Sequence, residues 1–403
     1  MTITLWDFTW YTRTGPGQPF HDLDAAFAEA VDRGYDTVRI CAMPYLLFGS
    51  GVDTSALRFS GLGGEYGQRT RWYDVPLVQP AVNGVSWLLS LFSAARRHGC
   101  RVIVSSWEFQ QSPSFAVDDG WHRSLQAVPY ADRVTALADA HADLMDLLVE
   151  NGLAGTVAFV ELHNEVQYSG LNDGRGVLGM QPLMENGISR FKARHPTVPV
   201  TVNYARVPVG EMRGLPRNAD VAIFHPYVYG VLGELYEEFA LRDPARPYPQ
   251  ERAYAELLRP DAPPLESWQP PASWKTAATV VPHREIYTHD WCDPVAWDRW
   301  LYDRYGAHRL AMRSTLDLWM DAAADHAASL DIPLVFGEGW VGYTPLHASF
   351  EEGPVGAAIC AHAVRRARSL GAWGTVVCSN AAPHHPMWQD VDLQRRLNAE
   401  FRA

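Results

Sequence analysis

Short apolar runs alternate with longer amphipathic stretches along most of this chain of 403 residues. Runs rich in β-branched residues are typical of buried strands, whereas apolar residues three or four positions apart predict helices. We expect eight strands, at residues 3–8, 37–43, 101–107, 156–162, 198–204, 220–226, 333–338 and 374–380. We expect helices between most of these strands, at residues 22–34, 83–99, 132–152, 176–195, about 304–330 and 353–371.

Eight alternations of strand and helix predict an α/β fold of the (β/α)8 TIM barrel type, in which functional residues gather at the carboxyl ends of the strands. An open doubly wound sheet is the alternative. The first strand is followed by WDFTWYTRTGPGQPF, which lacks a Gly-rich phosphate-binding fingerprint. We therefore favour the barrel. Residues 206–219 contain two Pro and two Gly, so at most a short helix fits between the fifth and sixth strands.

Barrels often exceed the average domain length, and we expect residues 1–403 to form one domain. Three long connections, at 44–81, 108–130 and 228–303, fall on the expected functional face. The third is rich in Pro and aromatic residues. Its aromatic side chains could wall a sugar pocket or form a small satellite core, and both readings stay open. They are Trp268, Trp274, Tyr287, Trp291, Trp297 and Trp300.

Composition narrows the class of protein. The chain is 47% hydrophobic and 20% charged, as globular proteins are, and its net charge of −12 argues against nucleic-acid binding. The segment MTITLWDFTWYTRTG lacks the features of an export signal, and no run of about 18 apolar residues occurs. We expect a cytoplasmic protein that does not bind membranes. The five scattered cysteines indicate no disulfide framework, and no pattern indicates an oligomeric state.

Two glutamates stand where predicted strands end, Glu165 in ELHNEV and Glu338 in VFGEGW. Two carboxyl groups converging at strand ends can cleave a glycosidic bond. One must be protonated to donate to the leaving oxygen, while the other is ionised to attack the anomeric carbon or to activate water. We predict that this pair is catalytic. A separation of about 5–5.5 Å between the carboxyl groups would mean retention of configuration, and about 6.5–9.5 Å would mean inversion.

Motifs at four predicted strand ends resemble those of the cellulase-like relatives of glycoside hydrolase family 5, which are retaining enzymes with (β/α)8 barrels. In that family an Arg ends the second strand, Asn-Glu the fourth, His-x-Tyr the sixth and Gly-Glu the seventh. The motifs GYDTVRICAMPY, VELHNEV, IFHPY and VFGEGW supply the same residue types in the same order. These residues are Arg39, Asn164, Glu165, His225, Tyr227 and Glu338. The resemblance covers nearly the whole barrel but not the insertions.

The resemblance implies a role for each residue. Glu338 would be the nucleophile, with Arg39 lowering its pKa and the Tyr227 hydroxyl holding it by a hydrogen bond. Glu165 would be the acid/base, with a pKa raised by burial near Glu338.

The resemblance also implies that Asn164 would donate to the sugar 2-hydroxyl, and that His225 would position the acid/base or the substrate. A buried core histidine is the alternative for His225.

The third and eighth strands depart from the family pattern. The third strand lacks the expected His and offers Trp107 and Glu108, which we expect to contact substrate, with an ion pair as the alternative for Glu108. The eighth strand ends in Ser379 and Asn380 instead of the usual platform Trp. Trp388, farther along the chain, could substitute for it from the loop, and the absence of a platform is the alternative. We expect Trp388 and Trp340 to contact substrate.

Other chemistries have weaker support. Glu161 shares a strand face with Glu165, and we expect it to be structural because a buried carboxylate needs a partner. The sequences HHP at 384–386 and THDWCD at 288–293 lack metal-site spacing, and no GxSxG occurs. We therefore expect neither a metal nor a cofactor.

The hypothesis for function is a retaining hydrolase of β-glycosidic bonds in small oligosaccharides or glycosides, acting by double displacement. Long insertions favour a closed pocket and exo action. A noncatalytic sugar-binding barrel that has lost turnover is the alternative, and both hypotheses imply a carbohydrate ligand.

Overall fold

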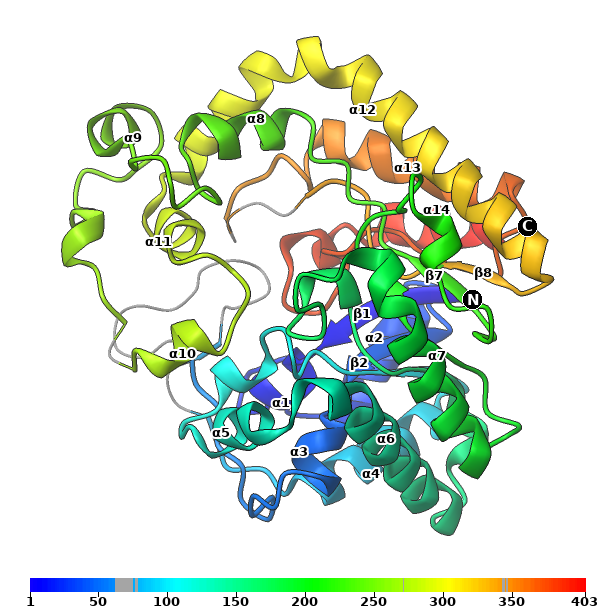
Figure 1. The fold of residues 1–403 in the computed structure, drawn as a ribbon. Coiled ribbons are helices and arrows are strands. Elements are labelled where there is room, and N and C mark those ends of the chain that lie inside the picture. The colour runs from blue at the N-terminus through cyan, green and yellow to red at the C-terminus, as the bar shows by residue number, and fades with distance from the viewer. Residues whose placement is uncertain (62–74, 77–78, 271, 343–344, 346) are drawn as a thin grey trace.

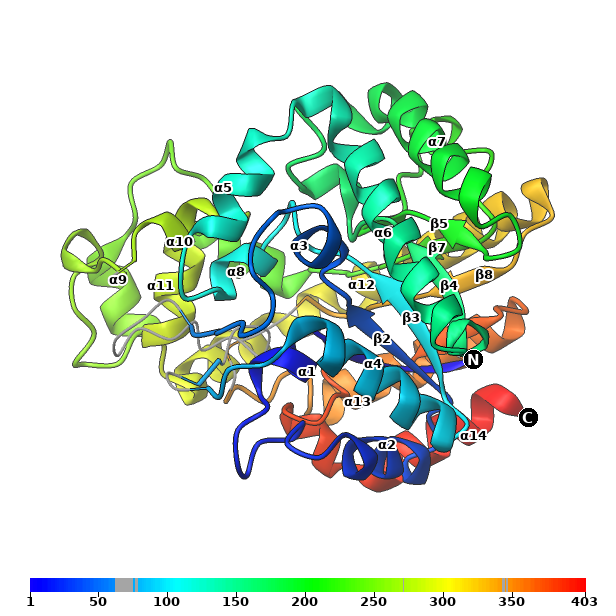
Figure 2. The same ribbon diagram turned by 90° about the horizontal axis from the view of Figure 1, so that it is seen from below.

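The computed structural model describes residues 1–61, 75–76, 79–270, 272–342, 345 and 347–403. Its strands surround a common centre (Figures 1 and 2). The strands are β1 (Thr2–Asp7), β2 (Thr37–Cys41), β3 (Arg101–Ser105), β4 (Val157–Glu161), β5 (Val200–Thr201), β6 (Asn203–Tyr204), β7 (Ala222–Phe224), β8 (Leu334–Phe336) and β9 (Gly374–Val376).

The sheet closes on itself through an interrupted strand. Its order is β5-β4-β3-β2-β1-β9-β8-β7-β6, and every pairing is parallel. Strands β5 and β6 stand at opposite ends of this order, yet only Val202 separates them in the chain. They are two halves of one barrel strand. The fold is therefore a (β/α)8 barrel with insertions, and all eight predicted strands are confirmed.

Long helices cover the outside of the barrel (Figure 2). They are α2 (Leu23–Asp32), α4 (Gly84–Arg97), α6 (Arg133–Glu150), α7 (Gly176–Arg194), α12 (Pro294–Leu330), α13 (Pro354–Ser369) and α14 (Val391–Arg402). The six predicted helices are confirmed. Helix α12 begins ten residues earlier than expected (304 − 294), because the side chain of Asp293 caps it by accepting from the N–H groups of Val295 and Ala296.

Shorter helices lie in the connections. They are α1 (Thr9–Thr12), α3 (Pro44–Phe48), α5 (Gly120–Ala127), α8 (Val231–Glu238), α9 (Gln250–Glu256), α10 (Trp274–Ala277) and α11 (His283–Trp291). Between β6 and β7 the chain forms one turn of 3-10 helix, Met212–Gly214, as its Pro and Gly content predicts. Across the described residues, no helix combines the length and the apolar character needed to cross a membrane.

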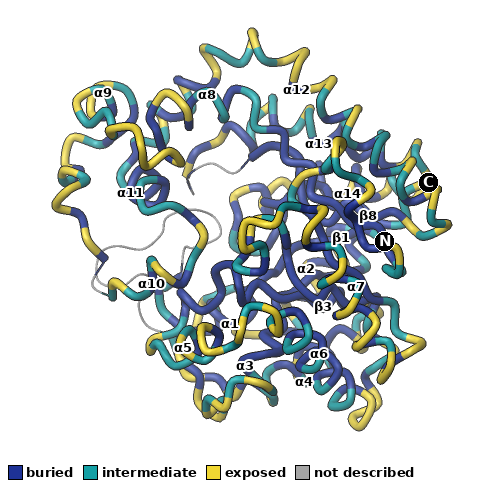
Figure 3. Tube along the Cα trace, viewed as in Figure 1, coloured by how far each residue is buried: buried dark blue, intermediate teal, exposed yellow. Residues whose placement is uncertain are grey.

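The two faces of each strand bury different kinds of side chain. On β2, Val38 and Ile40 are fully buried and point outward to the helices, while Arg39 alternates with them and points into the barrel. Figure 3 shows the same organisation over the whole chain, with buried strands at the centre and exposed turns on the outer helices. The inward positions at the strand ends therefore carry the polar side chains that build the site.

The insertion after β7 contributes α8 to α11, which lie to one side of the strands (Figure 1). Trp268, Tyr287 and Trp297 within it or at its end are fully buried. Trp268 and Tyr287 pack edge to face with their ring centroids 5.8 Å apart. These three aromatic residues belong to the hydrophobic core, so they fit the core reading of the two that the sequence left open.

Candidate active site

A pocket of about 350 Å³ opens at the carboxyl ends of the strands. Its lining includes Trp107, Asn164, Glu165, Tyr227 and Glu338, which reach it from four different strand ends. The structure therefore brings the two predicted catalytic glutamates into one cavity.

The guanidinium of Arg39 organises the floor of this pocket. Its Nε donates to Glu161 Oε1 at 2.7 Å and its Nη2 donates to Glu161 Oε2 at 2.8 Å. Nη2 also donates to Asn164 Oδ1 at 2.7 Å, and Nη1 donates to Glu338 Oε1 at 2.6 Å. Because a guanidinium is planar, these bonds fix the three partners relative to one another. Glu161 is fully buried in this ion pair and is structural, as expected.

Both carboxylate oxygens of Glu338 accept hydrogen bonds. Arg39 holds Oε1, and the Tyr227 hydroxyl donates to Oε2 at 2.6 Å. Burial raises the pKa of Glu338, while Arg39 and Tyr227 oppose that rise by stabilising the charged form. We expected Arg39 to bring the pKa of Glu338 below its ordinary value. The pKa of Glu338 is raised instead, because desolvation outweighs the ion pair with Arg39.

Glu165 stands in a different environment. Its backbone has a φ of 43°, and its N–H donates to Asn203 Oδ1 at 2.6 Å. Among the described residues, the hydrogen-bond partners of its side chain are the neutral groups Gln110 Nε2 at 3.1 Å and His225 Nδ1 at 3.2 Å. Burial and then the charge of Glu338 raise the pKa of Glu165 to about 8. The predicted rise is confirmed, and this carboxyl is protonated at neutral pH.

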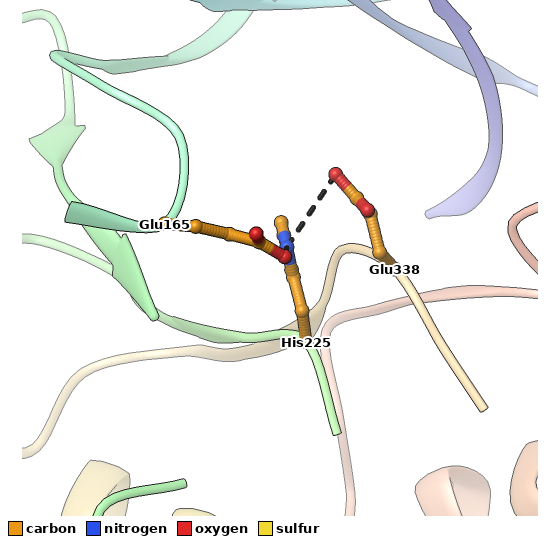
Figure 4. A group of neighbouring side chains, drawn as sticks. All are labelled: Glu165, His225 and Glu338. Atoms are coloured by element: carbon orange, nitrogen blue, oxygen red, sulfur yellow. Dashed lines mark hydrogen bonds and ion pairs between the residues drawn. The ribbon is translucent and has the colours of Figure 1, made fainter. Parts of the chain in front are cut away.

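His225 lies between the two glutamates (Figure 4). Its Nδ1 is 3.2 Å from Glu165 Oε1 and 3.4 Å from Glu338 Oε1. One oxygen of each carboxyl group and a ring nitrogen of His225 all lie within 4.8 Å of one another. Burial holds the pKa of His225 well below its ordinary value, so the ring is neutral. His225 is thus both a buried histidine and a direct contact of the pair.

These three side chains form the one group of His, Cys, Asp and Glu among the described residues that is compact enough to hold a metal ion. Their surroundings are poorly suited to one. Both oxygens of Glu338 already accept short bonds, and the positive charge of Arg39 lies 2.6 Å from Oε1, where it would repel a second cation.

Two positioning contacts had no signal in the sequence. The amide of Gln110 accepts from Asn164 Nδ2 at 2.8 Å and donates to Glu165, so one side chain links both members of the Asn-Glu motif. Asn203 anchors the backbone of Glu165 and also donates to Glu161. The predicted strand at 198–204 contained Asn203, but nothing marked it as a partner of the fourth strand.

Asp7 and Ser379 also join the floor. Asp7 ends β1 with a φ of 43°, and its Oδ1 is 3.8 Å from Arg39 Nη1. Burial and then the charge of Glu338 raise the pKa of Asp7 well above its ordinary value, so its neutral form is favoured. Ser379 Oγ lies 2.5 Å from the Tyr227 hydroxyl and accepts from the Gly339 N–H at 2.9 Å. Ser379 therefore supports Tyr227 at the place where the family pattern has a platform Trp.

Of the two candidate residues after β3, Trp107 lines the pocket and Glu108 binds the backbone of α3. The Trp107 ring lies under the Arg39 guanidinium at 4.4 Å and lines the pocket. Glu108 accepts from the backbone N–H groups of Tyr45 and Leu46 at 3.0 and 2.7 Å, which hold the start of α3. Glu108 is not among the described pocket residues, because the backbone of α3 occupies its carboxyl group. Burial raises the pKa of Glu108 to about 7.

Neither of the other two tryptophan candidates is among the described residues that line the pocket. Trp340 is buried and donates from Nε1 to the carbonyl of Val377 at 2.8 Å. Trp388 packs against α2, where Nε1 donates to Glu29 Oε2 at 2.7 Å and the guanidinium of Arg33 covers the ring at 4.2 Å. The expectation that these rings contact substrate is corrected, since both are fixed in the protein interior.

The insertion walls the pocket, but through residues other than the six aromatic candidates. Tyr229, Arg242, Val280 and Glu285 line it, whereas the six aromatic candidates are absent from its described lining. The Val280 N–H donates to the carbonyl of Gln110 at 2.8 Å, which ties the insertion to the loop after β3.

Comparison with known proteins agrees with this fold. Residues 3–169 match a family model described as "Cellulase-like: Sugar-binding cellulase-like". No curated protein matches the sequence. Among solved structures, a "putative glycoside hydrolase" from Parabacteroides distasonis ATCC 8503 is 18% identical, with a TM-score of 0.69 over 99% of this chain and 93% of that chain.

More distant structures include the endo-1,4-β-D-mannanase of Thermotoga petrophila RKU-1, which is 14% identical with a TM-score of 0.46 over 93% of this chain and 86% of that chain. Endo-glycoceramidase II from Rhodococcus sp. is also 14% identical, with a TM-score of 0.49 over 98% of this chain and 78% of that chain. The family model confirms the resemblance of this chain to cellulase-like proteins over residues 3–169, and the structure from Parabacteroides distasonis shares its fold.

Proposed function

We propose that the protein is a retaining glycoside hydrolase that cleaves β-glycosidic bonds of small oligosaccharides or glycosides by double displacement. The observation that supports this most is the meeting of Glu165 and Glu338 in one pocket, where Arg39 and Tyr227 stabilise the charged form of Glu338, while burial and the charge of Glu338 raise the pKa of Glu165 to about 8. A pure binding protein has no need for such an arrangement.

Glu338 is the proposed nucleophile. Its carboxylate is ion-paired with Arg39 and hydrogen-bonded to Tyr227, and both contacts stabilise the negative charge and aim the group. In the first step a Glu338 oxygen forms a bond to the anomeric carbon while the bond to the leaving oxygen breaks, giving a glycosyl-enzyme ester.

Glu165 is the proposed acid/base. With a pKa of about 8 it is protonated at neutral pH and donates its proton to the leaving oxygen. Formation of the glycosyl ester removes the negative charge of Glu338, which lowers the pKa of Glu165. Glu165 then accepts a proton from the water that hydrolyses the ester.

Retention is supported by the closeness of the pair. One oxygen from each glutamate lies within 4.8 Å of the other. Retaining enzymes hold their carboxyl groups about 5–5.5 Å apart, whereas inverting enzymes leave about 6.5–9.5 Å for a water molecule. The short separation therefore favours direct attack by Glu338.

Neighbouring residues have supporting roles in this proposal. Asn164 uses one amide hydrogen for Gln110, and its second is directed to the sugar 2-hydroxyl. His225 bridges the two glutamates as a neutral ring, and Trp107 provides an apolar surface beside Arg39.

The size of the pocket favours small substrates. Its volume of about 350 Å³ is near the lower end of the usual range for ligand pockets, about 300–1,000 Å³. Because residues of the insertion line this same pocket, we propose that the insertion and the barrel act as one catalytic unit with exo action.

A panel of 4-nitrophenyl β-glycosides tests the proposal. Wild type should release nitrophenol from at least one sugar, and Glu338→Ala and Glu165→Ala should lose that activity while keeping the wild-type circular dichroism spectrum. For Glu165→Ala, added azide should restore turnover and yield a glycosyl azide of retained configuration, because azide needs no general base. Equal release by all three proteins would refute the assignment.

A further inference from the structure

The pocket wall that comes from the insertion contains a charged pair outside the catalytic floor. Arg242 Nε donates to Glu285 Oε2 at 2.7 Å, and Arg242 Nη2 donates to Glu285 Oε1 at 2.9 Å. Nη2 also donates to the Tyr229 hydroxyl at 3.2 Å. All three residues line the same pocket as the catalytic glutamates.

The pair is built with the carboxylate behind and the guanidinium in front. The side chain of Glu285 is fully buried, whereas that of Arg242 is 42% exposed. Aromatic rings also support the guanidinium, with its Cζ 5.0 Å from the ring of Tyr229 and 4.6 Å from the ring of Tyr236. This support holds the planar group in one orientation before any ligand binds.

The chemistry of this wall suits a sugar ring. Because Glu285 balances the charge of Arg242, the pair by itself does not attract an anion, and the 42% exposed guanidinium presents its N–H groups to the pocket beside the Tyr229 hydroxyl. Adjacent hydroxyls of a sugar need such an array. The ring of Tyr229 and the side chains of Val280 and Pro282 add apolar surface for the C–H faces of the ring.

Two observations place this wall on the side of Glu165. Arg242 is close enough to Glu165 to lower its pKa electrostatically. Val280 is hydrogen-bonded to the backbone of Gln110, whose amide donates to Glu165. In a double displacement the acid/base faces the leaving-group oxygen. The wall therefore borders the space that the leaving group must occupy.

We propose that Arg242, Glu285 and Tyr229 form a leaving-group subsite for a neutral, hydroxylated ring, namely a second sugar residue. This inference rests on the proposed function, because it takes Glu165 to be the acid/base. It makes the preferred substrate a disaccharide or a short oligosaccharide instead of a glycoside with an apolar aglycone.

A comparison of two substrates tests the subsite. For the sugar that wild type accepts, kcat/KM is measured with the 4-nitrophenyl β-glycoside and with the set of β-linked disaccharides of that sugar, of which the best substrate is used for the variants. Arg242→Gln and Glu285→Gln should reduce the disaccharide value by about 10- to 100-fold more than the nitrophenyl value, since only the sugar leaving group loses bonds to a charged partner. Arg242→Lys keeps the positive charge but not the planar set of guanidinium donors, so it should also reduce kcat/KM more for the disaccharide than for the nitrophenyl glycoside.

The matched control is Arg252→Gln. Arg252 pairs with Glu256 at 2.8 Å and covers the ring of Phe239 at 4.9 Å, but it is not among the described residues that line the pocket. This variant should change both substrates equally, by less than about twofold. Thermal unfolding of each variant shows whether a loss of activity comes from a loss of folded protein. If Glu285→Gln is unstable, the test relies on the Arg242 variants, because the side chain of Arg242 is 42% exposed.

The outcomes separate this inference from the proposed function. Nitrophenol release without disaccharide cleavage by wild type, or equal losses on both substrates in the Arg242 variants, would overturn the subsite and leave the glycosidase intact. Absence of hydrolysis of either substrate would remove the proposed function and the subsite with it.

Discussion

The floor and the wall of the pocket are built in different ways. The floor consists of side chains at barrel strand ends that bind one another through Arg39, which contacts Glu161, Asn164 and Glu338. The wall consists of residues from the insertion after β7, fixed by the pair of Arg242 and Glu285. The difference separates two tasks: the barrel sets protonation states and geometry for the reaction, and the insertion sets what fits beside them.

The largest effect should come from removing the nucleophile in the floor. Glu338→Gln keeps the size of the side chain but cannot form the glycosyl ester, so kcat should fall by about 10⁴-fold or more. Steady-state hydrolysis of an activated aryl glycoside measures this. Glu256→Gln is the control and should keep wild-type kcat, because Glu256 pairs with Arg252 and is not among the described residues that line the pocket. A loss below about tenfold in Glu338→Gln would place the reaction elsewhere.

Arg39→Met should be nearly as damaging and should also destabilise the fold. It leaves Glu161 buried without its partner, which costs about 3–5 kcal/mol of unfolding free energy. Denaturant titration measures this loss, and kinetics measures activity.

The double variant Arg39→Met with Glu161→Gln separates the two roles of Arg39. Neutralising Glu161 should recover much of the stability, while activity should stay low because Glu338 still lacks its ion pair. Recovery of activity together with stability would show that Arg39 serves the fold alone.

Gln110→Leu tests the residue that links floor and wall, since the side chain of Gln110 binds Glu165 and its carbonyl accepts from Val280. Glu165 must be protonated in the free enzyme, so kcat/KM should fall as pH rises through about 8. Gln110 donates to Glu165 and lowers its pKa, so removal of this bond should move the basic limb upward by about 0.5–1 pH unit. Gln167→Leu is the control, since its amide binds the backbone of Ala205 and not Glu165. A downward shift in Gln110→Leu would contradict the assigned bond.

Glu108→Gln should have the smallest effect on activity. Glu108 holds the backbone of α3, so the variant should lose about 1–3 kcal/mol of stability and keep kcat within about twofold of wild type. Chemical denaturation and hydrolysis rates check the two parts. A collapse of kcat at unchanged stability would make Glu108 a reacting group.

The floor could be predicted from the sequence because strands fix their own geometry. Once the apolar runs predict eight strands, alternation decides which side chains point inward, and Arg39, Asn164 and Glu338 follow from their places at strand ends. Contacts made by loops could not be predicted in the same way. Gln110 and Glu108 lie two residues apart, yet one binds Glu165 and the other binds α3.

Residues beyond the strands show the same limit. Helix α14 was not predicted, because its buried face includes Gln394 and Asn398 and so lacks a continuous apolar stripe. Gln394 donates to the carbonyl of Met387, and Asn398 donates to that of Arg33. For buried aromatic residues of the insertion, such as Trp268 and Trp297, a place in a core was only one of two alternatives, since composition alone does not tell a core from a pocket wall.

Trapping with a 2-deoxy-2-fluoro β-glycoside that carries an activated leaving group tests the central claim most directly. The fluorine slows hydrolysis of the glycosyl-enzyme more than its formation, so the intermediate accumulates. Peptide mapping by mass spectrometry should find the sugar on Glu338 in wild type and no label in Glu338→Gln. A label on Glu165 or Glu108, or turnover to a product of inverted configuration, would contradict the account.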